Sequence, residues 1–249
     1  MSSVAEAPPE GSAQRRRVDP RALIEALGSA AVVTGLVTVA STFLPDRYVA
    51  TAVAAVFLAA TWALVWRLDD KRVLASGLAL GRIVLPGSLE IGELLRSILK
   101  TLGWAALFAA ITFVPFYFGW QKWWHPHGAW KLRINELELL NEIAGQLVII
   151  ALPEEAFYRG YLQSRLDEAL PWKTRILGAE VGPALLITSL VFALGHFATI
   201  REPARLAVFF PSLVFGWLRA RTHGIGAGVT FHASCNIFSE LLGKGFRVY

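Results

Sequence analysis

The sequence predicts an all-α, polytopic helical membrane protein with about seven transmembrane helices. Apolar residues make up 55% of the 249 residues and charged residues only 17%, whereas a soluble domain carries about 25% charged residues. Several uncharged runs approach the roughly 20 residues that a helix needs to cross a bilayer. No stretch between these runs is long enough to bury a core of its own, which excludes a separate soluble domain.

Composition along the chain indicates three regions. Residues 1–25 are polar, contain a run of three arginines and predict a disordered cytoplasmic tail. Residues 26–138 form the N-terminal membrane helices, and residues 139–242 form a helical core that carries ionisable side chains. The expected spans are, in chain order, 26–44, 48–66, 101–120, 139–166, 181–200, 206–218 and 225–242.

Two segments between the spans predict contacts with the membrane surface. Residues 89–99 place apolar side chains on one helical face, as an amphipathic helix that lies along the interface does. Residues 120–130 are rich in Trp, which is enriched where a protein meets the lipid headgroups. His125 and His127 lie in this second segment, and solvated histidines are favoured there over a metal-binding pair.

The distribution of Lys and Arg predicts the orientation of the chain. With seven spans, about two thirds of the 24 Lys and Arg residues fall on the side of the N-terminus. Short cytoplasmic loops hold the excess of these residues. We therefore expect an integral protein of a bacterial inner (cell) membrane with its N-terminus in the cytoplasm. The positive charge reflects this topology, and no nucleic-acid partner is expected.

The fourth span contains three ionisable residues, Glu154, Glu155 and Arg159, and such residues inside a membrane span are candidates for a functional site. Glu155 and Arg159 are four residues apart, which favours an ion pair. Glu154 lies about 100° round the helix and is left free to react. Pro153 removes a backbone donor and can loosen the packing enough to admit water. The alternative is that both acids are solvated and inert at the cytoplasmic end of the span.

Two later spans contribute histidines. Phe192 and His196 share a face of the fifth span, although the expected spans put Glu154 toward the inner half of the membrane and His196 toward the outer half. In the seventh span, small or polar residues recur every four positions along one face. They are Gly224, Gly228, His232 and Asn236. Two glycines in this spacing let a neighbouring helix approach closely.

These side chains can together form a hydrolytic site. A carboxylate can act as general base toward water, one imidazole can hold or shuttle the proton, and a second imidazole with an amide can stabilise an oxyanion. Cys235 faces about 60° away from His232 on a helix, so it is interpreted as an apolar filler and not a nucleophile.

The three motifs, E-E-x-x-x-R, F-x-x-x-H and H-x-x-x-N on successive helices, resemble those of the CPBP family. This family comprises CAAX-processing and bacteriocin-processing intramembrane proteases of glutamic type, also called Abi or Rce1-like. The resemblance implies that Glu154 and His196 activate water, that His232 and Asn236 form the oxyanion pocket, and that residues 139–242 are the catalytic core. It implies that Glu155 and Arg159 order the site.

The resemblance also implies which partners and cofactors to expect. The substrate would be a membrane protein or a lipid-modified protein, cleaved at a prenylated tail, a leader peptide or a C-terminal sorting anchor. No cofactor and no metal are expected, the alternative being a zinc site formed by Glu154, His196 and His232. Two other functions remain open: a proton-coupled transporter, in which the same groups relay protons, and a non-catalytic interaction or immunity protein.

Overall fold

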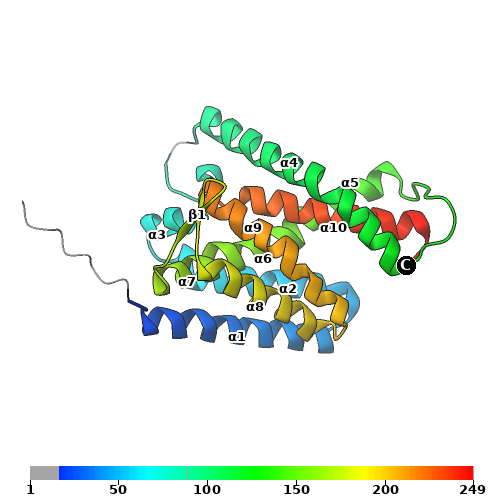
Figure 1. Cartoon of the computed structure of the whole chain (residues 1–249). Helices are drawn as coiled ribbons and strands as arrows, with labels where there is room; N and C mark the ends of the chain where they lie inside the picture. The colour runs from blue at the N-terminus through cyan, green and yellow to red at the C-terminus, as the bar shows by residue number, and fades with distance from the viewer. Residues whose placement is uncertain (1–16, 88, 249) are drawn as a thin grey trace, which may run out of the picture.

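A computed structural model describes residues 17–87 and 89–248. The protein is an all-α membrane protein, as predicted, with a single short β-hairpin among the described residues. Figure 1 shows the helices running roughly along one direction, with the start of α1 at one end of the bundle and the C-terminus at the other. This placement of the termini agrees with an odd number of crossings.

The N-terminal helices form a hairpin, α1 (Pro20–Phe43) and α2 (Asp46–Thr61), the second extended by a π-helical turn, η1 (Trp62–Trp66). The Asp19 side chain caps α1 by accepting hydrogen bonds from the backbone N–H groups of Arg21 and Ala22, and Pro20 suits the first helical position. The predicted tail, residues 1–25, is therefore too long, because α1 already begins at Pro20. Residues 1–16 lie outside the described residues.

Helix α4 (Ile91–Trp124) follows the short helices α3 (Asp70–Ala75) and η2 (Leu80–Arg82). The expected interfacial helix over 89–99 and the expected span over 101–120 are one continuous helix, which corrects that division. Neither Gly, Pro nor a capping residue separates Leu99 from Thr101, so nothing ends the helix there. Of the described helices, α1, α2 with η1, and α4 are long and apolar enough to cross a membrane.

The predicted fourth span is one helical rod from Glu136 to Ala169 that alternates between α and π geometry. Its segments are α5 (Glu136–Ala144), η3 (Gly145–Ala151), α6 (Leu152–Glu155), η4 (Ala156–Gln163) and α7 (Ser164–Ala169). The short segment α6, which carries Pro153 and both glutamates, lies between two π-helical segments. Such π-helical turns are frequent at functional sites.

A β-hairpin follows in a region where no element was expected. Its strands β1 (Thr174–Ile176) and β2 (Ala179–Val181) pair antiparallel, and Gly178 occupies the turn with φ +83°, which glycine adopts without strain. The helix of the fifth span therefore begins at Pro183, two residues after the predicted start at residue 181. The chain ends with α8 (Pro183–Thr199), η5 (Pro203–Val208), α9 (Phe209–Thr222) and α10 (Gly226–Phe246).

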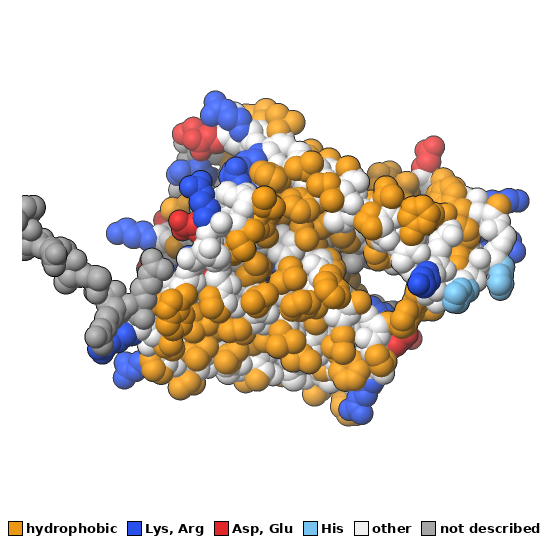
Figure 2. Space-filling view, in the orientation of Figure 1, with side chains coloured by type: hydrophobic (Ala, Val, Ile, Leu, Met, Phe, Trp, Pro, Cys, Tyr) orange, Lys and Arg blue, Asp and Glu red, His pale blue; other side chains and the backbone are white. Residues whose placement is uncertain are grey.

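The surface is divided as expected for a bilayer protein. Figure 2 shows hydrophobic side chains over the middle of the visible face, with charged side chains gathered toward the two ends. The main core lies between α1, α2, the rod and α8, and it contains buried residues such as Phe57, Phe157 and Phe192. A second cluster joins α4 to α9 and α10 through aromatic rings.

Candidate active site

Glu155 and Arg159 form an ion pair in the interior of the bundle, as their spacing predicted. Arg159 Nη1 donates to Glu155 Oε1 at 2.9 Å, and both side chains are 0% exposed. The pair is therefore shielded from water, and the alternative of a solvated, inert Glu155 is excluded. In such surroundings each charge depends on the other for compensation.

Arg159 has further partners that connect three elements. Its Nη2 donates to Ser212 Oγ of α9 at 2.6 Å. Its guanidinium lies over the rings of Phe192 in α8 and Phe215 in α9, at 4.5 and 5.2 Å from their centroids. A planar cation stacks well on aromatic faces. Arg159 thus fixes the rod against α8 and α9, and nothing in the sequence motifs indicated Ser212 or Phe215.

His232 of α10 lies between the two glutamates. Its Nδ1 is 3.0 Å from Glu155 Oε1, and its Nε2 is 3.9 Å from Glu154 Oε2. The imidazole stacks on the ring of Phe215 at a centroid distance of 4.7 Å. Gly228 lets α10 come this close, because a Cβ at that position would lie 2.9 Å from Glu155 Oε2. A glutamate that neutralises Arg159 therefore also orients an imidazole.

Glu154 and His196 line one small cavity of about 100 Å³ between α1, α2, the rod and α8. The expectation that Glu154 and His196 lie at different depths in the membrane is therefore wrong. The rod continues to Ala169, which brings Glu154 to the same depth as the last turns of α8. Within the described residues, Glu154 Oε2 is buried without a hydrogen-bond partner. The other residues that line the cavity are Thr34, Val37, Ser41, Val53, Phe57, Tyr158, Gly195 and Thr199.

The tautomer of His196 follows from its contact with the backbone. Its Nδ1 lies 3.0 Å from the carbonyl oxygen of Phe192, and a carbonyl only accepts hydrogen bonds. Nδ1 therefore carries the hydrogen, and in the neutral ring Nε2 is the nitrogen with a free lone pair. That nitrogen is able to accept or hold a proton.

Asn236 lies one helical turn beyond His232 and has a different partner. Its Nδ2 donates to Gln146 Oε1 at 2.9 Å, and Gln146 Nε2 donates to Glu142 Oε1 at 3.0 Å. Gln146 also lines a cleft of about 600 Å³ near the C-terminal end of the bundle. The structure thus gathers Glu154, Glu155, Arg159, His196 and His232, while Asn236 borders this group from the side of Gln146.

Within residues 17–87 and 89–248, no three His, Cys, Asp or Glu side chains are grouped so that they could hold a metal ion. His125 and His127 are both exposed at the end of α4, where solvated histidines were expected.

Tyr158 and Thr34 are among the cavity residues that were not predicted. Tyr158 stands inside the first motif, four residues after Glu154, so helical spacing could have indicated that it shares a face with Glu154. Thr34 belongs to α1, which the motifs do not include, and no signal in the sequence connects it to the site.

Fold and site together define a polytopic membrane protein with a buried carboxylate and imidazole site. Residues 136–238 match the family model described as type II CAAX prenyl endopeptidase Rce1-like. This match confirms the predicted CPBP/Rce1-like family over a segment that contains all three motifs. No curated protein and no solved structure gave a match.

Proposed function

We propose that the protein is an intramembrane endopeptidase of glutamic type. It hydrolyses a peptide bond near the terminus or the membrane anchor of a protein that is itself inserted in the membrane or carries a lipid. The family match supports the general activity, a CAAX-type intramembrane protease. The particular mechanism and the roles of individual residues are our proposal.

The observation that carries the proposal is the cavity that Glu154 and His196 share. Its volume of about 100 Å³ accommodates a few waters, since a water occupies about 30 Å³ in the liquid. The apolar side chains of Val37, Val53 and Phe57 form much of its wall. Glu154 lines this space, and its Oε2 has no hydrogen-bond partner among the described residues, which suits a general base whose partner is water.

In the proposed reaction, Glu154 takes a proton from water while the water oxygen bonds to the carbonyl carbon of the scissile peptide. The π electrons of that carbonyl move to its oxygen and form an oxyanion. His196 holds the transferred proton through its free Nε2, and the proton finally goes to the leaving amine as the C–N bond breaks. His232 and Asn236 form the oxyanion pocket, and Glu155 with Arg159 holds His232 in place.

The substrate belongs to one of three chemical classes: a prenylated C-terminal tail, a leader peptide or a C-terminal sorting anchor. The matching family consists of prenyl endopeptidases, which makes a farnesylated peptide the first probe to use. A prenyl chain, or the membrane anchor of a substrate, would enter laterally from the lipid.

The function is tested by comparing cells that express the wild-type chain with cells that express the Glu154→Gln variant. We expect a terminal protein fragment in the membrane or secreted proteome only with the wild type. In proteoliposomes, the purified wild type should cleave a quenched fluorescent peptide that contains the cut junction. Substrate-dependent proton flux without any cleavage product would instead indicate a transporter.

A further inference from the structure

Tyr158 occupies the same cavity as Glu154 and His196. It is 2% exposed, and it lies in η4 four residues after Glu154. Its hydroxyl is near the backbone of Gly195, the neighbour of His196, because a Cβ at Gly195 would be 3.0 Å from the hydroxyl oxygen. The side chain of Thr34 lies close to the same point, because its Oγ1 would be 3.9 Å from that Cβ. A polar group is therefore held at the wall of the reaction space.

The ring of Tyr158 is fixed by aromatic neighbours on three elements. Its centroid is 5.5 Å from that of Phe57 in α2, 5.3 Å from that of Phe157 and 5.0 Å from that of Phe192 in α8. The contacts with Phe157 and Phe192 are T-shaped, which is a favourable arrangement of rings. The hydroxyl therefore keeps its position without a change of rotamer, as a preorganised donor requires.

The two residues proposed for the oxyanion pocket each have one polar atom already engaged within the protein. The Asn236 amide already donates to Gln146, and the Nδ1 atom of His232 is engaged by Glu155. Of the hydroxyls that line the cavity, that of Thr199 donates to the backbone oxygen of His196. Tyr158 combines an O–H group, a rigid ring and a place beside the proposed base.

We propose that Tyr158 is a further catalytic residue, whose hydroxyl donates a hydrogen bond to the oxyanion formed when water adds to the scissile carbonyl. This inference rests on the proposed function. In the addition step the water proton moves to Glu154, the new C–O bond forms and the carbonyl π electrons become a lone pair on oxygen. The Tyr158 proton stays on its own oxygen and is only shared, while the neighbouring Thr34 hydroxyl helps to orient that of Tyr158.

The test compares Tyr158→Phe with Tyr161→Phe on the cleaved peptide. Tyr161 is the matched control, because it is a buried tyrosine of the same segment whose hydroxyl contacts Ser29 and Glu25 of α1, outside the cavity. Tyr158→Phe should lower kcat by about 10² to 10³, the loss typical of one missing oxyanion donor. KM, melting temperature and the acidic limb of the pH profile should stay at wild-type values, and Tyr161→Phe should retain wild-type kcat.

A second variant keeps the proposal testable if Tyr158→Phe folds poorly. Thr34→Val should lower kcat about tenfold in the wild-type background and leave it unchanged in the Tyr158→Phe background, since the two hydroxyls act together. Wild-type kcat in both Tyr158→Phe and Thr34→Val would overturn the proposal. A shifted acidic limb in Tyr158→Phe would also overturn it, because the hydroxyl would then act on Glu154. Failure of the wild type to cleave any peptide would instead reject the proposed function.

Discussion

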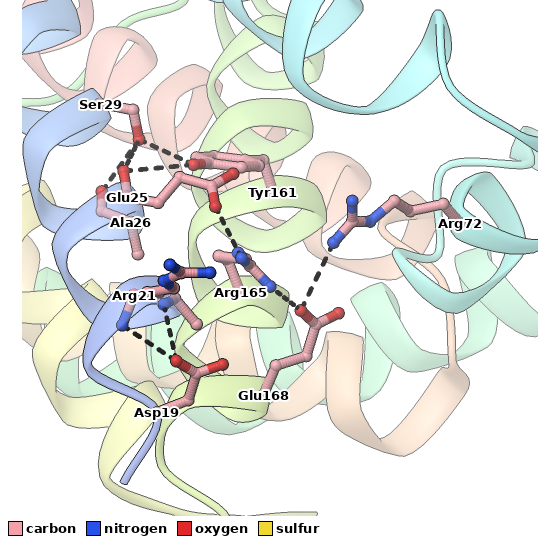
Figure 3. Close-up of polar contacts among 10 residues, drawn as sticks. Asp19, Arg21, Glu25, Ala26, Ser29, Arg72, Tyr161, Arg165 and Glu168 are labelled. Carbon is pink, nitrogen blue, oxygen red and sulfur yellow. Dashed lines mark hydrogen bonds and ion pairs between the residues drawn. The ribbon is translucent and has the colours of Figure 1, made fainter.

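Two networks of carboxylates and arginines among the described residues differ in their depth below the surface. Figure 3 shows the first, at the end of the bundle where α1 begins: Arg165 pairs with Glu25 of α1 and with Glu168, which also reaches Arg72. In the second, Glu155 and Arg159 are 0% exposed, whereas the Glu25 side chain is 48% exposed. The outer network can exchange its partners for water, and the inner pair cannot.

Because of this difference in exposure, the two networks of ion pairs have different energetic consequences. Exposed ion pairs contribute little to stability because water competes for both charges. A buried pair is costly to form and costlier to break, because removing one partner leaves the other charge without compensation. The inner pair is therefore a poor means of stabilising the fold. Its role is better explained by the site, because Glu155 also holds His232 in position.

The largest effect is expected from breaking the inner pair. Glu155→Gln leaves the Arg159 guanidinium without its counter-charge, so it should lower the free energy of unfolding by about 3 to 5 kcal/mol. Unfolding of the purified protein in detergent by a denaturant or by heat measures this loss. Arg159→Met together with Glu155→Gln should recover much of it, because the double variant buries no charge. Wild-type stability for Glu155→Gln alone would mean that water reaches the pair.

A much smaller effect is expected in the outer network. Glu25→Gln removes the carboxylate that accepts from Arg165 at 2.6 Å, and the loss should be below about 1 kcal/mol. Raising the salt concentration to about 1 M should remove most of the difference from wild type, because the Debye length falls to about 3 Å. A salt-independent loss comparable with that of Glu155→Gln would contradict the proposed contrast.

No effect on the wild-type rate is expected from removing metal ions. A water activated by a carboxylate needs no cation, whereas a catalytic zinc would hold that water itself. Chelators should leave cleavage intact, and elemental analysis should show no stoichiometric zinc. About one zinc per chain, with activity lost on chelation and restored by zinc alone, would make Glu154, His196 and His232 ligands.

Sequence reasoning succeeded where local periodicity carries the information. The helical class followed from the apolar runs, and the pairing of Glu155 with Arg159 followed from a spacing of four residues. The expectation of a separate helix over 89–99 was wrong, because an amphipathic pattern shows which face of a helix is apolar but does not show where the helix ends. The β-hairpin was missed because its strands have only three residues each, too few for an alternating pattern.

The site was only partly predictable for a different reason. The contact of His232 with Glu155 joins residues 77 positions apart, and the cavity brings Thr34 of α1 beside Tyr158. Such contacts depend on how helices pack, which the motifs do not encode. Helical spacing predicted that Asn236 and His232 share a face of the helix. In the structure, the amide of Asn236 donates a hydrogen bond to Gln146. Its role in the oxyanion pocket stays a prediction.

The central claim is that two adjacent glutamates have different tasks, Glu155 being committed to Arg159 and His232 while Glu154 acts on water. The most direct measurement is the rate of peptide hydrolysis by Glu154→Gln, with the melting temperature taken on the same sample. We expect a loss in rate of about 10² to 10⁴, the usual contribution of a general base, at an unchanged melting temperature. A wild-type rate in a folded Glu154→Gln protein would contradict the assignment of Glu154 as the base.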